Sequence, residues 1–93
     1  MENTVKPVKV PHVRAREQGD DLALFNVITA QYFVLNEVGR EIWNLCTGEY
    51  TIEEIAKEIP NRIEGAPSFD EVLTDAKELI EDLKDKNLVT LEE

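Results

Sequence analysis

The sequence predicts an α+β, winged-helix-like domain in which a small N-terminal three-stranded antiparallel sheet is followed by three helices. Two observations lead to this fold class. β-forming segments alternate with turn residues through the first third of the chain, whereas capping residues and apolar positions at helical spacing fill the rest. Because the chain has 93 residues, one domain is expected over 1–93, with segment 1–16 as a basic N-terminal arm or edge strand.

Three segments of the first third are predicted to be strands. Val5 to Arg16 mixes β-branched residues with charges, and Pro7 and Pro11 restrict it to an edge strand or an extended arm. Leu22 to Phe25 is a short apolar run that follows a turn signal, and Gln31 to Leu35 is rich in β-forming residues. The latter two segments are therefore expected to pair as a hairpin.

Capping residues predict the first two helices. Asn36 is a suitable N-cap for a helix from Glu37 to about Thr47. Thr51 and Glu54 form a capping box for the second helix, which Pro60 is expected to end.

Ser68 and Glu71 are expected to form a second capping box at the start of a long third helix, which ends near Lys86 and precedes a closing strand, Leu88 to Leu91. Helical spacing predicts an inward stripe made of Phe69, Val72, Ala76, Leu79 and Leu83. A shoulder beside the stripe alternates apolar and basic side chains, namely Leu73, Lys77, Ile80 and Lys84.

The charge balance disfavours nucleic acid and anionic membranes as partners. The chain contains 10 Lys and Arg residues and 20 Asp and Glu residues, which gives a net charge of −10. The N-terminus lacks the apolar stretch of a signal peptide, and no run reaches the length of a spanning helix. With a single cysteine, Cys46, the chain is expected to reside in the cytoplasm.

No catalytic or metal site is predicted. His12 is the lone histidine and has no ligand partner at a suitable spacing. Cys46 falls on the apolar face of its helix, where a thiol usually packs as a small hydrophobic group. We therefore expect no enzyme activity, no metal and no cofactor.

The chain resembles the PqqD-like family of peptide-modification chaperones over about two thirds of its length. The resemblance is carried by Tyr32-Phe33-Val34-Leu35-Asn36, Gly39, Ile42-Trp43, Leu45, Gly48, Thr51-Ile52, Ile55-Ala56, Asp75-Ala76, Leu79-Ile80, Leu83 and Leu88-Val89. Segment 26–31 lacks the Tyr-Pro-Glu-Gly typical of the members that serve pyrroloquinoline quinone synthesis, so a relative that serves another peptide is expected.

The resemblance implies a non-catalytic module that recognises the leader segment of a ribosomally synthesised precursor peptide and presents it to a modifying enzyme, commonly a radical SAM protein. Two alternatives remain open. A winged-helix transcription regulator would need a basic patch, which the charge balance argues against. An adaptor that only docks on an enzyme is equally compatible with the sequence.

The peptide is predicted to add a strand to a sheet edge and to lie against the third helix, where Lys77 and Lys84 would meet leader carboxylates. The expected binding residues are Gln31, Tyr32, Phe33, Val34, Leu35, Leu73, Lys77, Ile80 and Lys84. An open strand edge also pairs with a second copy, so the expected state is a monomer or a weak, strand-swapped homodimer.

Overall fold

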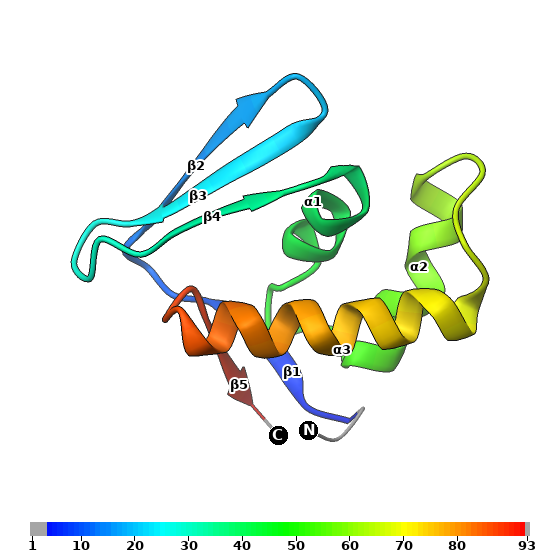
Figure 1. Ribbon diagram of the computed structural model, residues 1–93. Helices are drawn as coiled ribbons and strands as arrows, with labels where there is room; N and C mark the ends of the chain where they lie inside the picture. The colour runs from blue at the N-terminus through cyan, green and yellow to red at the C-terminus, as the bar shows by residue number, and fades with distance from the viewer. Residues whose placement is uncertain (1–3, 93) are drawn as a thin grey trace.

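A three-stranded antiparallel sheet, three helices and a separate two-stranded ribbon make up the computed structural model, which describes residues 4–92 (Figure 1). The elements are β1 (Lys6–Lys9), β2 (Val13–Gln18), β3 (Asp21–Asn26), β4 (Tyr32–Leu35), α1 (Glu37–Asn44), α2 (Ile52–Arg62), α3 (Phe69–Asp85) and β5 (Val89–Glu92). The predicted fold class is confirmed. Across residues 4–92, no helix has both the length and the apolar character that crossing a bilayer requires.

The main sheet has the strand order β2-β3-β4, so β4 lies at an edge. β3 and β4 pair in the predicted hairpin, with Leu22 opposite Leu35 and Phe25 opposite Tyr32. Gly19 has a φ of 65° in the turn between β2 and β3, a conformation that glycine adopts without steric cost.

The segment from Val5 to Arg16, expected as one edge strand or an extended arm, forms two strands that belong to different sheets. A turn at Pro11 separates them because proline fixes φ and supplies no N–H to a ladder. β1 pairs with β5, Lys6 lying opposite Glu92, whereas β2 pairs with β3. Residues 1–3 of the predicted basic arm lie outside the described residues.

All three predicted N-caps are present, but the capping box expected at Ser68 is reduced to one bond, from the Glu71 N–H to the Ser68 hydroxyl, and two helix ends differ from prediction. α1 ends at Asn44, earlier than expected, because the following backbone turns so that Thr47 bridges Val8 of β1. α2 continues through Pro60 to Arg62, since a proline in the last turn removes only one hydrogen bond near an exposed end.

α3 ends as predicted, although Asn replaces the usual glycine. Asn87 adopts a φ of 60°, and the N–H groups of Asn87 and Leu88 donate to the carbonyls of Lys84 and Leu83 at 3.0 and 2.8 Å. These two bonds form a Schellman motif, which turns the chain into β5.

The core lies between the inner face of the main sheet and the helices. Leu24 and Leu35 of the sheet pack into the same buried cluster as Ile42 of α1 and Ile55 of α2. The predicted phase of α3 needs one correction: Ile80, expected on the shoulder, is fully buried. The core stripe of α3 is centred between Val72 and Ile80, which leaves Leu79 at its margin and only partly buried.

Candidate functional site

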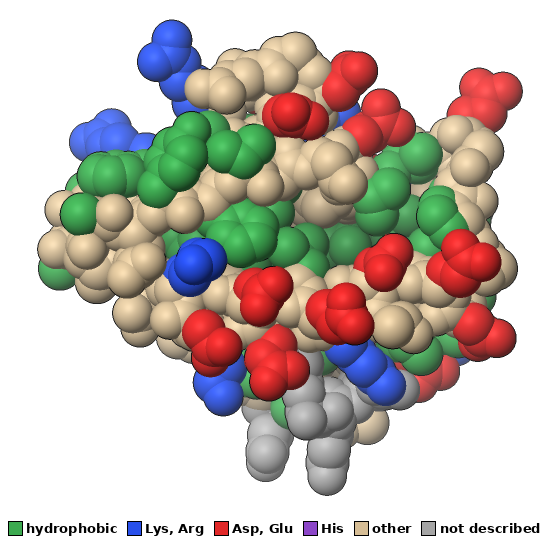
Figure 2. Space-filling view, viewed as in Figure 1, with side chains coloured by type: hydrophobic (Ala, Val, Ile, Leu, Met, Phe, Trp, Pro, Cys, Tyr) green, Lys and Arg blue, Asp and Glu red, His purple; other side chains and the backbone are tan. Residues whose placement is uncertain are grey.

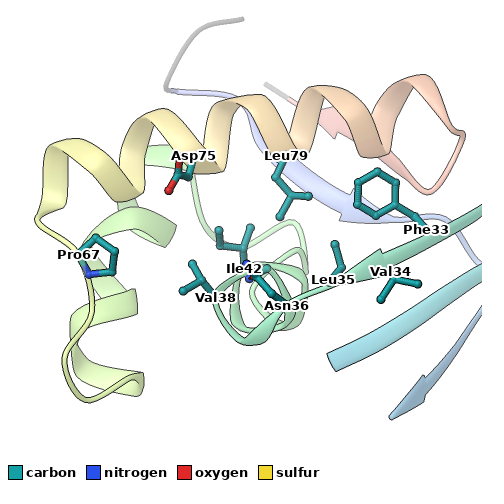
Figure 3. A pocket seen from close by; sticks show the side chains of 10 residues that line it. Phe33, Val34, Leu35, Asn36, Val38, Ile42, Pro67, Asp75 and Leu79 are labelled. Atoms are coloured by element: carbon teal, nitrogen blue, oxygen red, sulfur yellow. The ribbon is translucent and has the colours of Figure 1, made fainter. Parts of the chain in front are cut away.

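An open groove of about 560 Å³ runs between β4, the first turns of α1 and one side of α3 (Figure 3). Its walls are mostly apolar, and a band of hydrophobic side chains is visible between β4 and α3 in Figure 2. The lining residues are Phe33, Val34, Leu35, Asn36, Val38, Gly39, Ile42, Pro67, Asp75 and Leu79.

β4 presents unpaired backbone groups along this groove. In an antiparallel ladder, residue pairs that exchange hydrogen bonds alternate with pairs that do not. The N–H of Asn26 donates to the carbonyl of Gln31 at 2.9 Å, so the alternation places the bonded groups of β4 at Phe33 and Leu35. The N–H and C=O groups of Tyr32 and Val34 therefore face away from β3, toward the open edge.

The side chains of β4 divide between the two faces of the sheet, as its alternation predicts. Phe33 and Leu35 point to the helical side, where Leu35 is buried and Phe33 partly so. Tyr32 and Val34 are 56% and 44% exposed on the outer face. One face of β4 thus forms the groove wall and the other faces solvent.

The close approach of α1 to β4 depends on a cap and a glycine. The Asn36 side chain accepts a hydrogen bond from the N–H of Gly39 at 2.8 Å, which fixes the start of α1 directly after β4. A Cβ at Gly39 would lie 3.2 Å from the Cβ of Leu35. Glycine therefore lets α1 pack tightly enough for Val38 and Ile42 to line the groove.

Asn26 joins the sheet to the end of α3. Its Nδ2 donates to the carbonyl of Asn87 at 2.7 Å, while its Oδ1 accepts from the N–H groups of Ile28 and Thr29 at 2.9 and 3.1 Å. Asn26 is 4% exposed, so its side of these part-buried bonds is shielded from water. They fix the spacing between the β3–β4 hairpin and α3, and hence the width of the groove at this end.

The two ends of the groove carry opposite charges. Asp75 lies at the end near Pro67 (Figure 3), and Asp70 and Glu71 line a shallow hollow beside it. At the other end the Nζ of Lys86 lies 5.7 Å from the ring centre of Phe33, a cation–π geometry. Figure 2 shows acidic side chains along the exposed side of α3.

The structure brings only part of the predicted binding set to this groove. Phe33, Val34 and Leu35 line it, Tyr32 contributes the outward backbone groups just described, and Gln31 immediately precedes β4. None of the four predicted α3 residues lines it: Ile80 is buried in the core, Leu73 and Lys77 are half-buried, and Lys84 is exposed elsewhere on the helix. The groove lies on the other side of the core stripe, at Asp75 and Leu79.

Sequence reasoning missed the contribution of Val38, Ile42, Asp75 and Leu79 to the groove. Helical spacing assigns Leu79 to the inward stripe, and its position at the margin of that stripe is the signal that could have identified it. Asp75 carries no such signal, because it is one acidic residue among many on α3.

His12 and Cys46, the two side chains that the sequence offered for chemistry, do not line the groove. His12 is exposed, and no group of three potential ligands is close enough to hold a metal ion in residues 4–92. Burial raises the pKa of the Cys46 thiol to about 12, and the Sγ donates to the carbonyl of Ile42 at 3.3 Å. Because a nucleophilic cysteine needs a lowered pKa, Cys46 serves the core.

An exposed edge strand beside an apolar groove is typical of domains that bind extended peptides. The family model described as coenzyme PQQ synthesis protein D (PqqD) matches residues 21–89. The chain therefore belongs to the PqqD family.

Two solved structures share the fold. TbiB1 in complex with the TbiA(beta) leader peptide is similar with a TM-score of 0.72 and 26% sequence identity, over 88% of this chain and 93% of that one. Lasso peptide synthetase B1 complexed with the leader peptide is similar with a TM-score of 0.74 and 14% identity, over 91% of this chain and 98% of that one. A comparison with curated proteins gives no match.

Proposed function

We propose that this chain is a non-catalytic module that binds the leader segment of a ribosomally synthesised precursor peptide. The observation that carries the proposal is the open edge of β4 lying beside an apolar groove. Membership of the PqqD family and the likeness to TbiB1, which was solved with a leader peptide, support it. The bound leader would add a strand next to β4 and place alternate side chains in the groove.

The backbone and the groove have separate roles in this mode of binding. Hydrogen bonds to the outward groups of Tyr32 and Val34 supply affinity for any extended chain. The apolar wall formed by Phe33, Val38 and Leu79 selects side chains of suitable size. Burial of apolar area there contributes about 25 cal/mol per Å² before the costs of ordering the peptide are subtracted.

A role in transcription has no support from the comparisons. α3 would be the recognition helix of a winged-helix DNA-binding domain, yet its solvent side is acidic. A major-groove helix requires the opposite charge.

Presentation of the leader to a modifying enzyme, of the radical SAM class, is the second part of the proposal. The large hydrophobic side chains that are most exposed among residues 4–92 cluster on the outer face of the main sheet and its turn; they are Phe25, Val27, Ile28, Tyr32 and Val34. Arg14 lies opposite Phe25 in the register, and Arg16 lies opposite Ala23 on the same face. An enzyme surface that combines apolar and acidic residues would fit this face.

Leader binding can be tested by amide hydrogen exchange, using synthetic leaders of any short precursor-like peptide that is found encoded beside this gene. We expect the amides of Tyr32 and Val34 to become protected at saturating peptide. The amides of Phe33 and Leu35 already bond to β3 and serve as internal controls. Unchanged exchange at Tyr32 and Val34 with a tightly bound leader would show that strand addition is wrong.

A matched pair of proline variants tests the same edge independently. Val34→Pro removes an N–H that faces the groove edge, so leader affinity should fall at least tenfold. Ala15→Pro removes an N–H that faces the opposite edge of the same sheet, as the bond from Val27 N–H to His12 C=O indicates. It should leave affinity unchanged, provided circular dichroism shows both variants folded. Equal losses in both would contradict the proposal.

Docking of the modifying enzyme can be measured separately from leader binding. Phe25→Ser and Arg14→Glu alter the outer face on β3 and β2 and change no residue of β4 or of the groove lining. In a reaction reconstituted with a modifying enzyme and a precursor that are found encoded beside this gene, both variants should slow modification while leaving leader affinity unchanged. Full modification rates in both variants would reject the outer face as the docking surface.

A further inference from the structure

We infer that the peptide segment bound in the groove carries a basic side chain opposite Asp75 and an acidic side chain opposite Lys86, with apolar side chains between them. The inference rests on the proposed function and specifies its substrate class. It also replaces the charge arrangement expected from the sequence, in which Lys77 and Lys84 meet leader carboxylates.

The first step is that both charges are available to a ligand. Asp75 is exposed and lines the groove, and Lys86 lies over the Phe33 ring at its far end. The ion pairs found among residues 4–92 join Arg40 and Arg62 to Glu41 and Lys57 to Glu53, so neither Asp75 nor Lys86 takes part in an ion pair within the described chain. Asp70 and Glu71 strengthen the negative potential near Asp75.

The second step is that the residues lining the middle of the groove are apolar. Leu79 lies between the two charged ends along α3, opposite Ile42 and Leu35 (Figure 3). A charged peptide side chain placed there would lose its hydration without gaining a partner. The middle of the bound segment must therefore be apolar.

Helix geometry sets the spacing of the two charges in the peptide. Asp75 and Lys86 are eleven positions apart, which corresponds to about 16 Å along the helix axis. An extended strand covers about 3.3 Å per residue, so this distance equals about five residues. Because only alternate side chains face the groove, the basic and acidic residues should be about four or six positions apart in the peptide.

Selection from a displayed library of random 15-residue peptides tests the inference and does not require the natural leader. On the wild type, we expect enriched sequences to carry Lys or Arg at one position and Asp or Glu four or six positions away, with apolar residues between. Asp75→Lys should remove the preference for a basic peptide residue, and Lys86→Glu should remove the preference for an acidic one. A wild-type-selected peptide should bind each variant about fivefold or more weakly, since the reversal removes an ion pair and adds repulsion between like charges.

Matched controls make the same charge changes on α3 outside the groove. Glu81→Lys and Lys84→Glu alter exposed residues that do not line it, so both should retain the wild-type preference. Replacing the basic residue of a selected peptide by Glu should restore its affinity for Asp75→Lys.

Failure of this inference can be distinguished from failure of the proposed function. Enriched apolar peptides without a charge preference, or equal effects of Asp75→Lys and Glu81→Lys, would overturn this inference and leave peptide binding intact. A library from which the wild type enriches no peptide would count against the proposed function itself.

Discussion

Asn26 shows how a single side chain fixes the geometry of a binding surface. It is the buried polar residue of the described chain, and its amide satisfies three backbone groups from the β3–β4 turn and the end of α3. The sequence indicates only a turn at this position. Its partner Asn87 lies 61 residues away, so no local pattern could have predicted the bridge.

Replacing Asn26 by Ala should destabilise the fold by about 2 kcal/mol, because it leaves a carbonyl and two N–H groups without partners. The measurement is urea denaturation followed by tryptophan fluorescence, with peptide affinity measured on the folded variant. Affinity should fall as well, since α3 is no longer held against the hairpin. Thr29→Ala, which removes an exposed acceptor of the Gln31 N–H, should cost less than about 0.5 kcal/mol. Equal costs in the two variants would contradict the role given to Asn26.

Cys46 should react with thiol reagents only when the protein unfolds. The thiol is fully buried, and burial raises its pKa to about 12, so at pH 8 the reactive thiolate is both scarce and inaccessible. Labelling by a chromogenic disulfide should be negligible in buffer and should follow the unfolded fraction as urea is added. Thr90→Cys, at an exposed position of β5, provides a thiol that reacts at once. Rapid labelling of Cys46 in the native protein would show that α1 opens locally.

At the scale of elements, capping chemistry was predictable and long-range pairing was not. The N-caps at Asn36, Thr51 and Ser68 depend on neighbours three residues away, so the sequence contains the whole interaction. β1 depends on β5, at the opposite end of the chain. The predicted phase of α3 was displaced because both Leu79 and Ile80 are apolar, and only the packed core distinguishes them.

The capping box of α2 should make stability depend on pH. Hydrogen bonds from Thr51 lower the pKa of Glu54 below its ordinary value of 4.5. Because the pKa of Glu54 is lower in the folded state than in the unfolded state, the stabilisation is complete at pH values above the unfolded-state pKa. It is lost as the pH falls through the folded-state pKa. At pH 6 the wild type should therefore have a larger free energy of unfolding than Glu54→Gln. This difference should be smaller at pH 3. Parallel curves for the two proteins would contradict the capping role.

Two adjacent residues of α3 should show different functions when truncated. Ile80 is fully buried, so Ile80→Ala should cost about 2 to 5 kcal/mol of stability. Leu79 is partly buried and lines the groove, so Leu79→Ala should cost less stability and should weaken peptide binding severalfold. Denaturant titration and calorimetry with a bound peptide separate the two effects. If folded Ile80→Ala loses more peptide affinity than Leu79→Ala, the result would support the binding face predicted from the sequence, which contains Ile80.

At the scale of the whole molecule, the main sheet has two open edges with different surroundings. Every residue of β2 after Val13 is exposed, and Arg14, Arg16 and Glu17 place charges along that edge. Charged edges discourage pairing with other strands. β4 instead has apolar neighbours on both faces, so it is the edge at which another strand gains buried area as well as hydrogen bonds. Family resemblance indicated the edge at β4, but only the assembled sheet shows that charged residues protect the edge at β2.

Peptide binding and self-association through β4 should therefore exclude each other. In sedimentation equilibrium, the average mass of the free protein should rise with concentration, because two β4 edges can pair weakly across a twofold axis. A saturating peptide occupies the same backbone groups and should return the protein to a monomer. Val34→Pro should remain monomeric without peptide, whereas Ala15→Pro should behave like the wild type. A dimer that persists with bound peptide would place the contact between copies on another surface, with the apolar outer face around Phe25 and Tyr32 the first to examine by substitution.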